Sequence, residues 1–240
     1  TATTDDSKVT IVESTTVVTN TETTPTIAGY QLGDDIDGEA ANDQSGESVS
    51  LSSDGNIVAI GAFGNAGING SNSGHVRVYQ RDASKTTADT DQTSATFGPA
   101  GWNRLGDDID GEASPDSSGK SVSLSSDGSI VAIGAIYNAG NGISLGHVRV
   151  YQYDATKTEA DTDQTSATFG PVGWNRLGDD IDGEAASDYS GWSVSISSDG
   201  SIVAIGAPYN DGNGSAAGHV RVYQYNASKT EADTDQTSAT

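Results

Sequence analysis

The chain of 240 residues carries 34 acidic and 11 basic residues, which give a formal net charge of −23. A charge of this sign excludes nucleic acid and anionic membrane surfaces as partners held by simple electrostatics, and it makes cations the natural counter-species. The sequence has no cysteine, which excludes disulfides and thiolate metal sites. No apolar run approaches the roughly 18 residues of a membrane span, so we expect no membrane insertion.

The first segment, residues 1–31, is rich in threonine and differs from everything that follows it. Apolar and polar residues alternate over 9–13, and a β-prone run continues over 15–19 before Pro25. Three interpretations stay open for this segment. It is a strand that closes the fold within the chain, a strand donated to a neighbouring molecule, or a disordered spacer.

After this segment one sequence unit is repeated three times, beginning at Leu32, Leu105 and Leu177. Each copy contains LGDDIDGEA, then SVSLSSDG or SVSISSDG, then IVAIGA, then GHVRVYQ. Spacings of 73 and 72 residues predict an array of similar structural units of about 72 residues. The predicted repeats are 32–104, 105–176 and 177–240, and we expect the third to end within its connector.

Within the second copy the hydrophobic pattern has a period of two residues, which predicts strands. Val122 and Leu124 alternate with serines, so one face of this strand can pack against a core. Asp127 and Gly128 then predict a hairpin with a type I′ turn, which requires positive φ at both central residues. The predicted strands of this copy are 121–125, 130–133, 147–152 and 173–177.

Between the third and fourth strands lies a long polar connector, residues 154–170 in the second copy. Its sequence is repeated almost unchanged between copies. Loops of this length in compact domains are functional, have structure of their own, or are disordered. The sequence does not separate these alternatives.

The segments GESVSLSSDGNIVAIGA, GKSVSLSSDGSIVAIGA and GWSVSISSDGSIVAIGAP, each followed by GHVRVYQ, resemble FG-GAP-type β-propeller repeats. The resemblance covers most of residues 29–226. It implies an all-β, β-propeller-like array of three four-stranded antiparallel repeats in a secreted or cell-surface protein. Propellers close with about four to eight blades, so three repeats close with further repeats, close by association of chains, or stay open.

FG-GAP blades often carry an acidic calcium loop, D-x-[DN]-x-DG-x-x-D, between the first two strands. In the second copy Ser123, Ser125 and Val131 stand at three of its acidic positions, and only Asp127 and Gly128 remain. A single carboxylate cannot supply the six to eight oxygens that calcium takes. The calcium loop that the resemblance implies is therefore largely lost.

A second cation candidate is the acidic block that opens each copy. Four carboxylates within six residues repel one another unless solvent, hydrogen bonds or a hard cation intervenes. Two interpretations stay open, a solvated acidic turn and a Ca²⁺ site that stiffens the joints between repeats. The candidate metal ligands are Asp34, Asp35, Asp37, Glu39, Asp107, Asp108, Asp110, Glu112, Asp179, Asp180, Asp182 and Glu184.

Aromatic residues at positions where the copies differ are candidates for ligand binding. Trp192 stands where the other copies have Glu47 and Lys120, whereas Trp102 and Trp174 recur and are expected to pack within the sheets. Sugar sites use exposed aromatic rings beside polar groups, because such rings offer an apolar face with a polar handle. The candidate ligand-binding residues are Trp192, Tyr189 and Tyr209.

The repetition argues against an enzyme. His75, His147 and His219 occupy the same position in GHVRV, where we expect a hydrogen-bonding role at a strand edge, and no G-x-S-x-G nucleophile motif occurs. We predict an extracellular structural or adhesive repeat protein of the cell surface, a subunit of an assembly or fibre held by self-association or by neighbouring repeats. The alternative is a propeller module that binds glycans or surface proteins.

Overall fold

The computed structural model describes residues 30–140 and 143–228. The strand or spacer predicted within 1–29 and the connector residues 229–240 lie outside the described residues. The chain divides into two units, Thr1–Gln31 and Leu32–Thr240, and the second is described below. The described residues form strands and turns without a helix, which confirms the all-β class. Accordingly, no helix that could cross a membrane is found in the described part.

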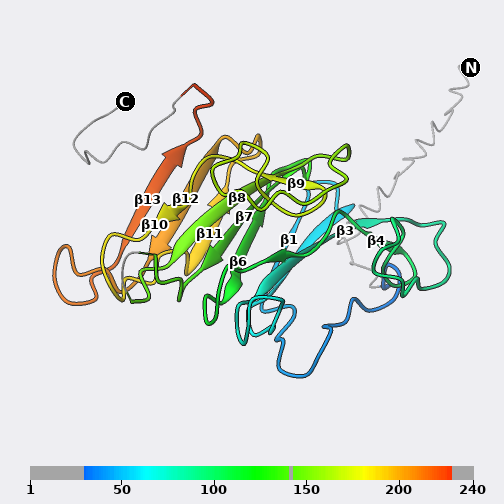
Figure 1. Cartoon of the computed structure of the whole chain (residues 1–240), viewed down its shortest axis with the longest axis horizontal. Coiled ribbons are helices and arrows are strands. Elements are labelled where there is room, and N and C mark those ends of the chain that lie inside the picture. The colour runs from blue at the N-terminus through cyan, green and yellow to red at the C-terminus, as the bar shows by residue number, and fades with distance from the viewer. Residues whose placement is uncertain (1–29, 141–142, 229–240) are drawn as a thin grey trace, which may run out of the picture. The chain divides into compact units, whose positions relative to one another are not determined.

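Three antiparallel sheets follow one another along the unit, one for each sequence copy (Figure 1). The first contains β1 (Ser48–Leu51), β2 (Ile57–Ala62), β3 (His75–Arg81), β4 (Trp102–Arg104) and β5 (Ile109–Asp110). The second contains β6 (Ser118–Leu124), β7 (Ile130–Ala135), β8 (His147–Tyr153), β9 (Trp174–Arg176) and β10 (Ile181–Asp182). The third contains β11 (Ser193–Ile196), β12 (Ile202–Ala207) and β13 (His219–Gln224).

The outer edge of the first two sheets differs from the four strands predicted per repeat. On β3 this edge is shared by two short strands, since β4 pairs with one end of β3 and β5 with the other. β5 lies within the acidic block that opens the second copy, so the first sheet takes residues from two copies. The second sheet has the same arrangement, with β9 and β10 both pairing with β8. Within the described residues the third sheet has three strands.

The Asp-Gly hairpins join the first two strands of each sheet as predicted, but the predicted type I′ turn is wrong. Gly128 has a positive φ of 73°, whereas Asp127 is not among the described residues with positive φ. The Asp127 carboxylate instead accepts hydrogen bonds from the hydroxyls of Ser125 and Ser129 at 2.7 and 2.8 Å. These side-chain bonds fix the turn without a left-handed aspartate.

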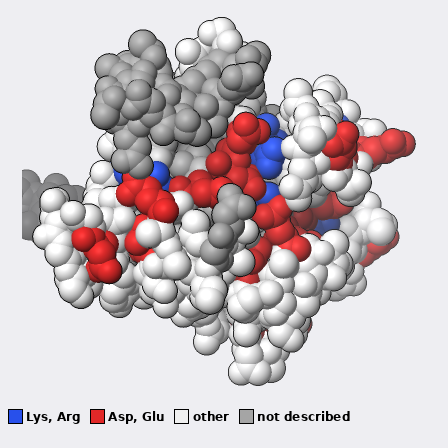
Figure 2. Space-filling model, turned by 60° about the vertical axis from the view of Figure 1, so that its left-hand side comes forward, with Lys and Arg blue, Asp and Glu red and all other residues white. Residues whose placement is uncertain are grey.

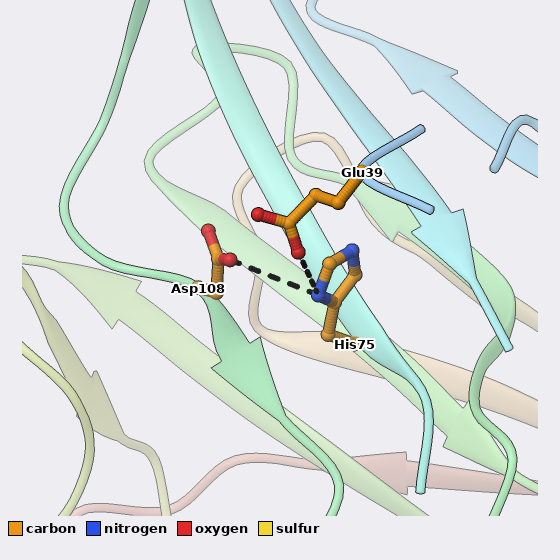
Figure 3. A group of neighbouring side chains, drawn as sticks. All are labelled: Glu39, His75 and Asp108. Carbon is orange, nitrogen blue, oxygen red and sulfur yellow. Dashed lines mark ion pairs between the residues drawn. The ribbon is translucent and has the colours of Figure 1, made fainter. Parts of the chain in front are cut away.

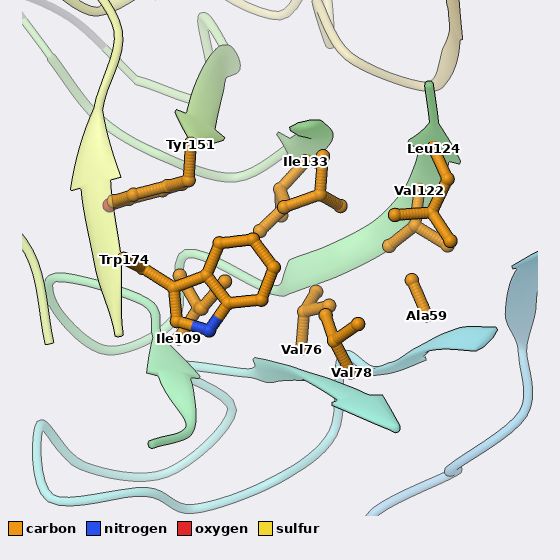
Figure 4. Close-up of a cluster of buried hydrophobic side chains, with 10 residues drawn as sticks. Ala59, Val76, Val78, Ile109, Val122, Leu124, Ile133, Tyr151 and Trp174 are labelled. Carbon is orange, nitrogen blue, oxygen red and sulfur yellow. The ribbon is translucent and has the colours of Figure 1, made fainter. Parts of the chain in front are cut away.

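The hydrophobic core lies between consecutive sheets. Val76 and Val78 of β3 pack against Val122 and Leu124 of β6, together with Trp174 (Figure 4). Trp174 is fully buried, which confirms its predicted packing role. Each sheet therefore buries apolar side chains by facing its neighbour, in the manner of stacked sheets.

Serine and glycine residues allow neighbouring sheets to approach closely on the same interface. Ser48 Oγ donates to the carbonyl of Gly119 at 2.7 Å, and Ser121 Oγ donates to the carbonyl of Gly191 at 2.7 Å. A Cβ atom built on Gly134 of β7 would lie 2.1 Å from the Gly191 carbonyl oxygen. Only glycine fits at this position of the middle strand.

The long connector is organised around a lysine. In the first copy Lys85 Nζ donates to the backbone carbonyls of Gly98 and Trp102 at 2.8 and 2.7 Å, and also to that of Thr96. Lys157 makes the equivalent three bonds in the second copy. Of the three predicted alternatives, structure of its own is therefore the one observed.

We expect Gly134→Ala to lower the free energy of unfolding by about 1–3 kcal/mol, the usual cost of overpacking, because its methyl group meets the backbone of the next sheet. Gly206→Ala is the matched control. The equivalent Cβ atom in the third sheet meets only the side chain of Ser193 in close contact, so we expect a much smaller loss. Chemical denaturation of both variants measures the difference, and equal losses would contradict this view of the interface.

Candidate functional site

Arginine–aspartate ion pairs lie where each acidic block meets the sheet before it. Arg77 Nε of β3 donates to both carboxylate oxygens of Asp108 at 3.2 Å. Arg104 Nη1 of β4 donates to Asp108 Oδ1 at 2.7 Å, and its Nη2 lies 3.2 Å from Asp107 Oδ1. The second aspartate of this block thus pairs with two arginines of the preceding sheet.

The glutamate of an acidic block pairs with an arginine of the sheet formed by its own copy, as Glu39 does with Arg77 of β3. Glu39 forms an ion pair with Arg77 and accepts hydrogen bonds from Gln92 and Asn65 at 3.2 and 3.4 Å. Figure 3 shows the carboxylates of Glu39 and Asp108 converging on the same ring nitrogen of His75. His75 Nδ1 lies 3.8 Å from Glu39 and 3.7 Å from Asp108, beyond hydrogen-bond distance of both carboxylates.

The second copy repeats this ion-pair cluster. Arg149 Nε donates to Asp180 at 2.6 Å, and Arg149 also forms an ion pair with Glu112. Arg176 Nη1 donates to the same Asp180 oxygen at 2.8 Å. Although burial opposes ionisation of Asp180, its hydrogen bond with Arg149 holds the pKa of this carboxyl below the usual value. Acidic side chains with basic ones beside them gather on one face of the molecule (Figure 2).

The third cluster is incomplete within the described residues. Glu184 lies 3.4 Å from His219 and 3.6 Å from Arg221. Arg221 Nε is buried and has no acceptor there, whereas the equivalent atoms of Arg77 and Arg149 both donate to an aspartate of the following block.

Burial sets the protonation of the other members. It lowers the pKa of His75, against the opposing charge of Asp108, so this histidine is neutral near pH 7. Burial together with the Asp108 charge raises the pKa of Asp110 to about 6. Asp110 is therefore costly in its charged form.

The first sheet leaves apolar side chains without cover on its outer side. Val49 and Leu51 of β1 are 63% and 61% exposed, whereas the equivalent Val122 and Leu124 of β6 are 8% and 7% exposed. The difference arises because β6 has a preceding sheet packed against it and β1 has none among the described residues.

The third sheet leaves the complementary side chains without cover. Val220 and Val222 of β13 are 67% and 65% exposed, whereas the equivalent Val76 and Val78 of β3 are almost fully buried. The two ends of the described array therefore carry the two halves of the interface that joins its sheets internally.

Comparison with protein families matches this repeating unit. A model described as FG-GAP repeat matches residues 36–79 and 181–223. The two matched segments are similar to FG-GAP repeats. Both matched segments run from the acidic block to the third strand of a sheet, which confirms the predicted resemblance. The search of curated proteins found no match for the chain.

The structure separates the acidic residues that the sequence grouped as metal ligands. The first aspartates of the three acidic blocks (Asp34, Asp107 and Asp179) are exposed. The second and fourth positions face different sheets, Asp108 the preceding one and Glu112 its own. Sequence reasoning missed Arg77 and Arg104, although both recur in every complete copy, because they were treated only as strand residues.

The residues that gather around each histidine fit calcium poorly. Glu39, His75 and Asp108 each offer one ligand atom within 4.8 Å of the others, as do Glu112, His147 and Asp180. Calcium takes six to eight oxygens, whereas this set offers two carboxylates and a nitrogen. The Arg77 guanidinium also pairs with both carboxylates already.

The candidate aromatic residues do come together. Tyr189, Trp192 and Tyr209 contact one another in a triangle, with ring centroids 6.4 Å (Tyr189–Trp192), 5.3 Å (Tyr189–Tyr209) and 5.9 Å (Trp192–Tyr209) apart. Tyr137 of the second copy contacts Tyr189 edge-on at 5.6 Å. These four rings line an open groove of about 510 Å³ together with Ser187, Asp211 and Ala216. Trp192 and Tyr209 are 41% and 47% exposed, so their rings are accessible.

We expect Asp110→Asn to raise the melting temperature by a few degrees at pH 7.5, with the gain shrinking as the pH falls below 6 and disappearing below pH 3.8. The folded-state pKa of about 6 lies above the ordinary value of 3.8, so the destabilisation by charged Asp110 is complete above pH 6 and is relieved as the pH falls from 6 to 3.8. Asp91→Asn is the control of opposite sign, since the hydroxyl of Thr93 lowers the Asp91 pKa. A gain for Asp110→Asn that does not change with pH would contradict the assignment.

We expect a chelator to leave the melting midpoint unchanged and added Ca²⁺ to raise it no more than Na⁺ at equal ionic strength. The reason is that arginine supplies the positive charge of each cluster. Differential scanning calorimetry with EDTA and with CaCl₂ measures this, because a ligand bound only by the folded state raises the midpoint. A midpoint that falls with EDTA and recovers with CaCl₂ would refute it.

Proposed function

We propose that the chain is an extracellular structural or adhesive protein whose propeller-like FG-GAP array joins end to end with copies of itself. The observation that carries this proposal is the match between the uncovered faces. β1 exposes the valine and leucine that β6 buries, and β13 exposes the valines that β3 buries. The β1 face of a second copy would pack on β13 in the way that the β6 face packs on β3 within the chain.

The complementarity extends beyond the apolar side chains. In the internal interfaces a serine hydroxyl and a glycine of one sheet approach the carbonyl of a glycine in the next, Gly119 or Gly191. Gly206 and Ser193 keep this arrangement in the third sheet, and Gly46 stands at the position of the approaching glycine in the first. Both ends thus retain the small residues that close approach requires.

Charge sets the conditions under which copies would join. A net charge of −23 on each copy repels other copies at low ionic strength, and salt screens this repulsion over a Debye length of about 10 Å at 0.1 M. Association is therefore promoted by raised salt. An environment rich in salt outside the cell suits such a protein.

The exposed apolar side chains alone give a weak joint. Burying Val49, Leu51, Val220 and Val222 contributes roughly 2 kcal/mol each at most. This sum is comparable to the roughly 4–15 kcal/mol that association costs in lost freedom of motion. A stable assembly needs hydrogen bonds or ion pairs in addition.

The role we propose is not catalytic. The buried neutral histidines lie in clusters whose arginines and carboxylates already neutralise one another, and these clusters are placed where one copy meets the next. Although FG-GAP repeats often bind calcium, the arginine-filled clusters support a charge-paired joint in its place.

We expect Gly206→Ala to abolish association while leaving the single copy folded, because its methyl group would collide with the carbonyl of Gly46 from the next copy. Static light scattering during a rise in NaCl concentration measures association, and thermal melting verifies folding. Ser215→Ala, on an exposed loop of the same copy, is the control and is expected to associate like the parent chain. Gly206→Ala that associates as readily as the parent would refute the proposed interface.

Carbohydrate binding is a second candidate function, favoured by the aromatic groove. Exposed rings of Trp192 and Tyr209 beside the Asp211 carboxylate offer stacking faces and a hydrogen-bond acceptor for a sugar. We expect Trp192→Ala to lose binding on a glycan array and Trp192→Phe to retain much of it. Absence of binding by the intact chain to any arrayed glycan would eliminate this candidate.

A further inference from the structure

We propose that residues 32–39 of one copy complete the third sheet of a neighbouring copy by pairing with the free edge of β13. This inference rests on the proposed end-to-end association and names the joint that holds it. The joint is a short antiparallel strand pair sealed by an aspartate–arginine ion pair.

The chain already makes this joint twice internally. Ile109 and Asp110 pair with Val76 and His75 of β3. In the second sheet Ile181 pairs with Val148 and Asp182 with His147, in the same register. Each time, the strand is supplied by the acidic block that opens the following copy.

The third sheet has the receiving edge. No strand pairs with the outer side of β13 among the described residues. Its residues His219 and Val220 repeat the sequence of the two internal receiving strands. The internal register therefore predicts that His219 faces Asp37, and Val220 faces Ile36, of the neighbouring copy.

Arg221, on the receiving strand β13, has a buried N–H group that a carboxylate could accept from. Arg221 Nε is buried and has no acceptor among the described residues, whereas the equivalent arginines donate to Asp108 and Asp180. In the first block Asp35 stands at the position of these two aspartates. Strand pairing in the internal register brings Asp35 of the neighbour to Arg221.

The donating block can make this contact without leaving its own sheet. Leu105 accepts a hydrogen bond from Trp174 Nε1 at 3.0 Å while its own N–H donates to the Val78 carbonyl at 2.8 Å. The carbonyl of Leu32 already accepts from Trp102 Nε1 at 2.9 Å. Its N–H would donate to the carbonyl of Val222 in the neighbour, as Leu105 does to Val78.

Disulfide trapping tests the register, because the chain contains no cysteine of its own. One preparation carries Asp37→Cys and another carries His219→Cys, and the two are mixed at an ionic strength at which the parent chain associates and are then oxidised. A disulfide requires Cα atoms roughly 4.4–6.8 Å apart, which directly paired strand residues satisfy. We expect a reducible covalent dimer on a non-reducing gel, at least about tenfold more abundant than with the control mixture below.

The control mixture pairs Asp37→Cys with Gln224→Cys, which lies five residues further along β13 and about 17 Å away. Ile36→Cys with Val220→Cys is a second matched pair, in case His219→Cys impairs folding. Association that is blocked by Gly206→Ala, combined with no preference for either matched pair, would overturn the donated strand and leave the proposed function standing. Absence of any association by the parent chain would overturn both.

Discussion

Face-to-face packing of one sheet on the next is the constraint on which the rest of the structure depends. The valines of β3 are buried only because β6 lies against them, and glycine in each middle strand lets the next backbone approach within contact. These valines and glycines recur in every copy, so every sheet has two faces suited to pack against a neighbouring sheet. At the ends of the described array this requirement is unmet, which makes the two outer faces the most informative surfaces of the molecule.

The acidic block links neighbouring sheets by serving both. Asp108 pairs with the arginines of the sheet before it, and Glu112 pairs with Arg149 of its own sheet. Because guanidinium groups lie between these carboxylates, a chain of high negative charge still makes joints that are locally close to neutral. Arginine supplies positive charge beside these carboxylates.

The period-two pattern and the Asp-Gly turns predicted the positions of the main strands, since alternation and turn chemistry are local properties. The split outer strand could not be predicted, because Ile109 is one apolar residue in an acidic block and its pairing with β3 depends on packing between copies. For the same reason the metal interpretation grouped Asp108 with Glu112, which are close in sequence but face different sheets. The aromatic candidates were found because Trp192 breaks the repetition, and a broken repeat is visible in sequence alone.

Electron microscopy of the full chain at raised ionic strength tests most directly whether copies join end to end. The account predicts filaments with an axial repeat of about 30 Å, which is three sheets at roughly 10 Å each. Single copies at every salt concentration would contradict it, because both outer faces would then be stable while exposed to water.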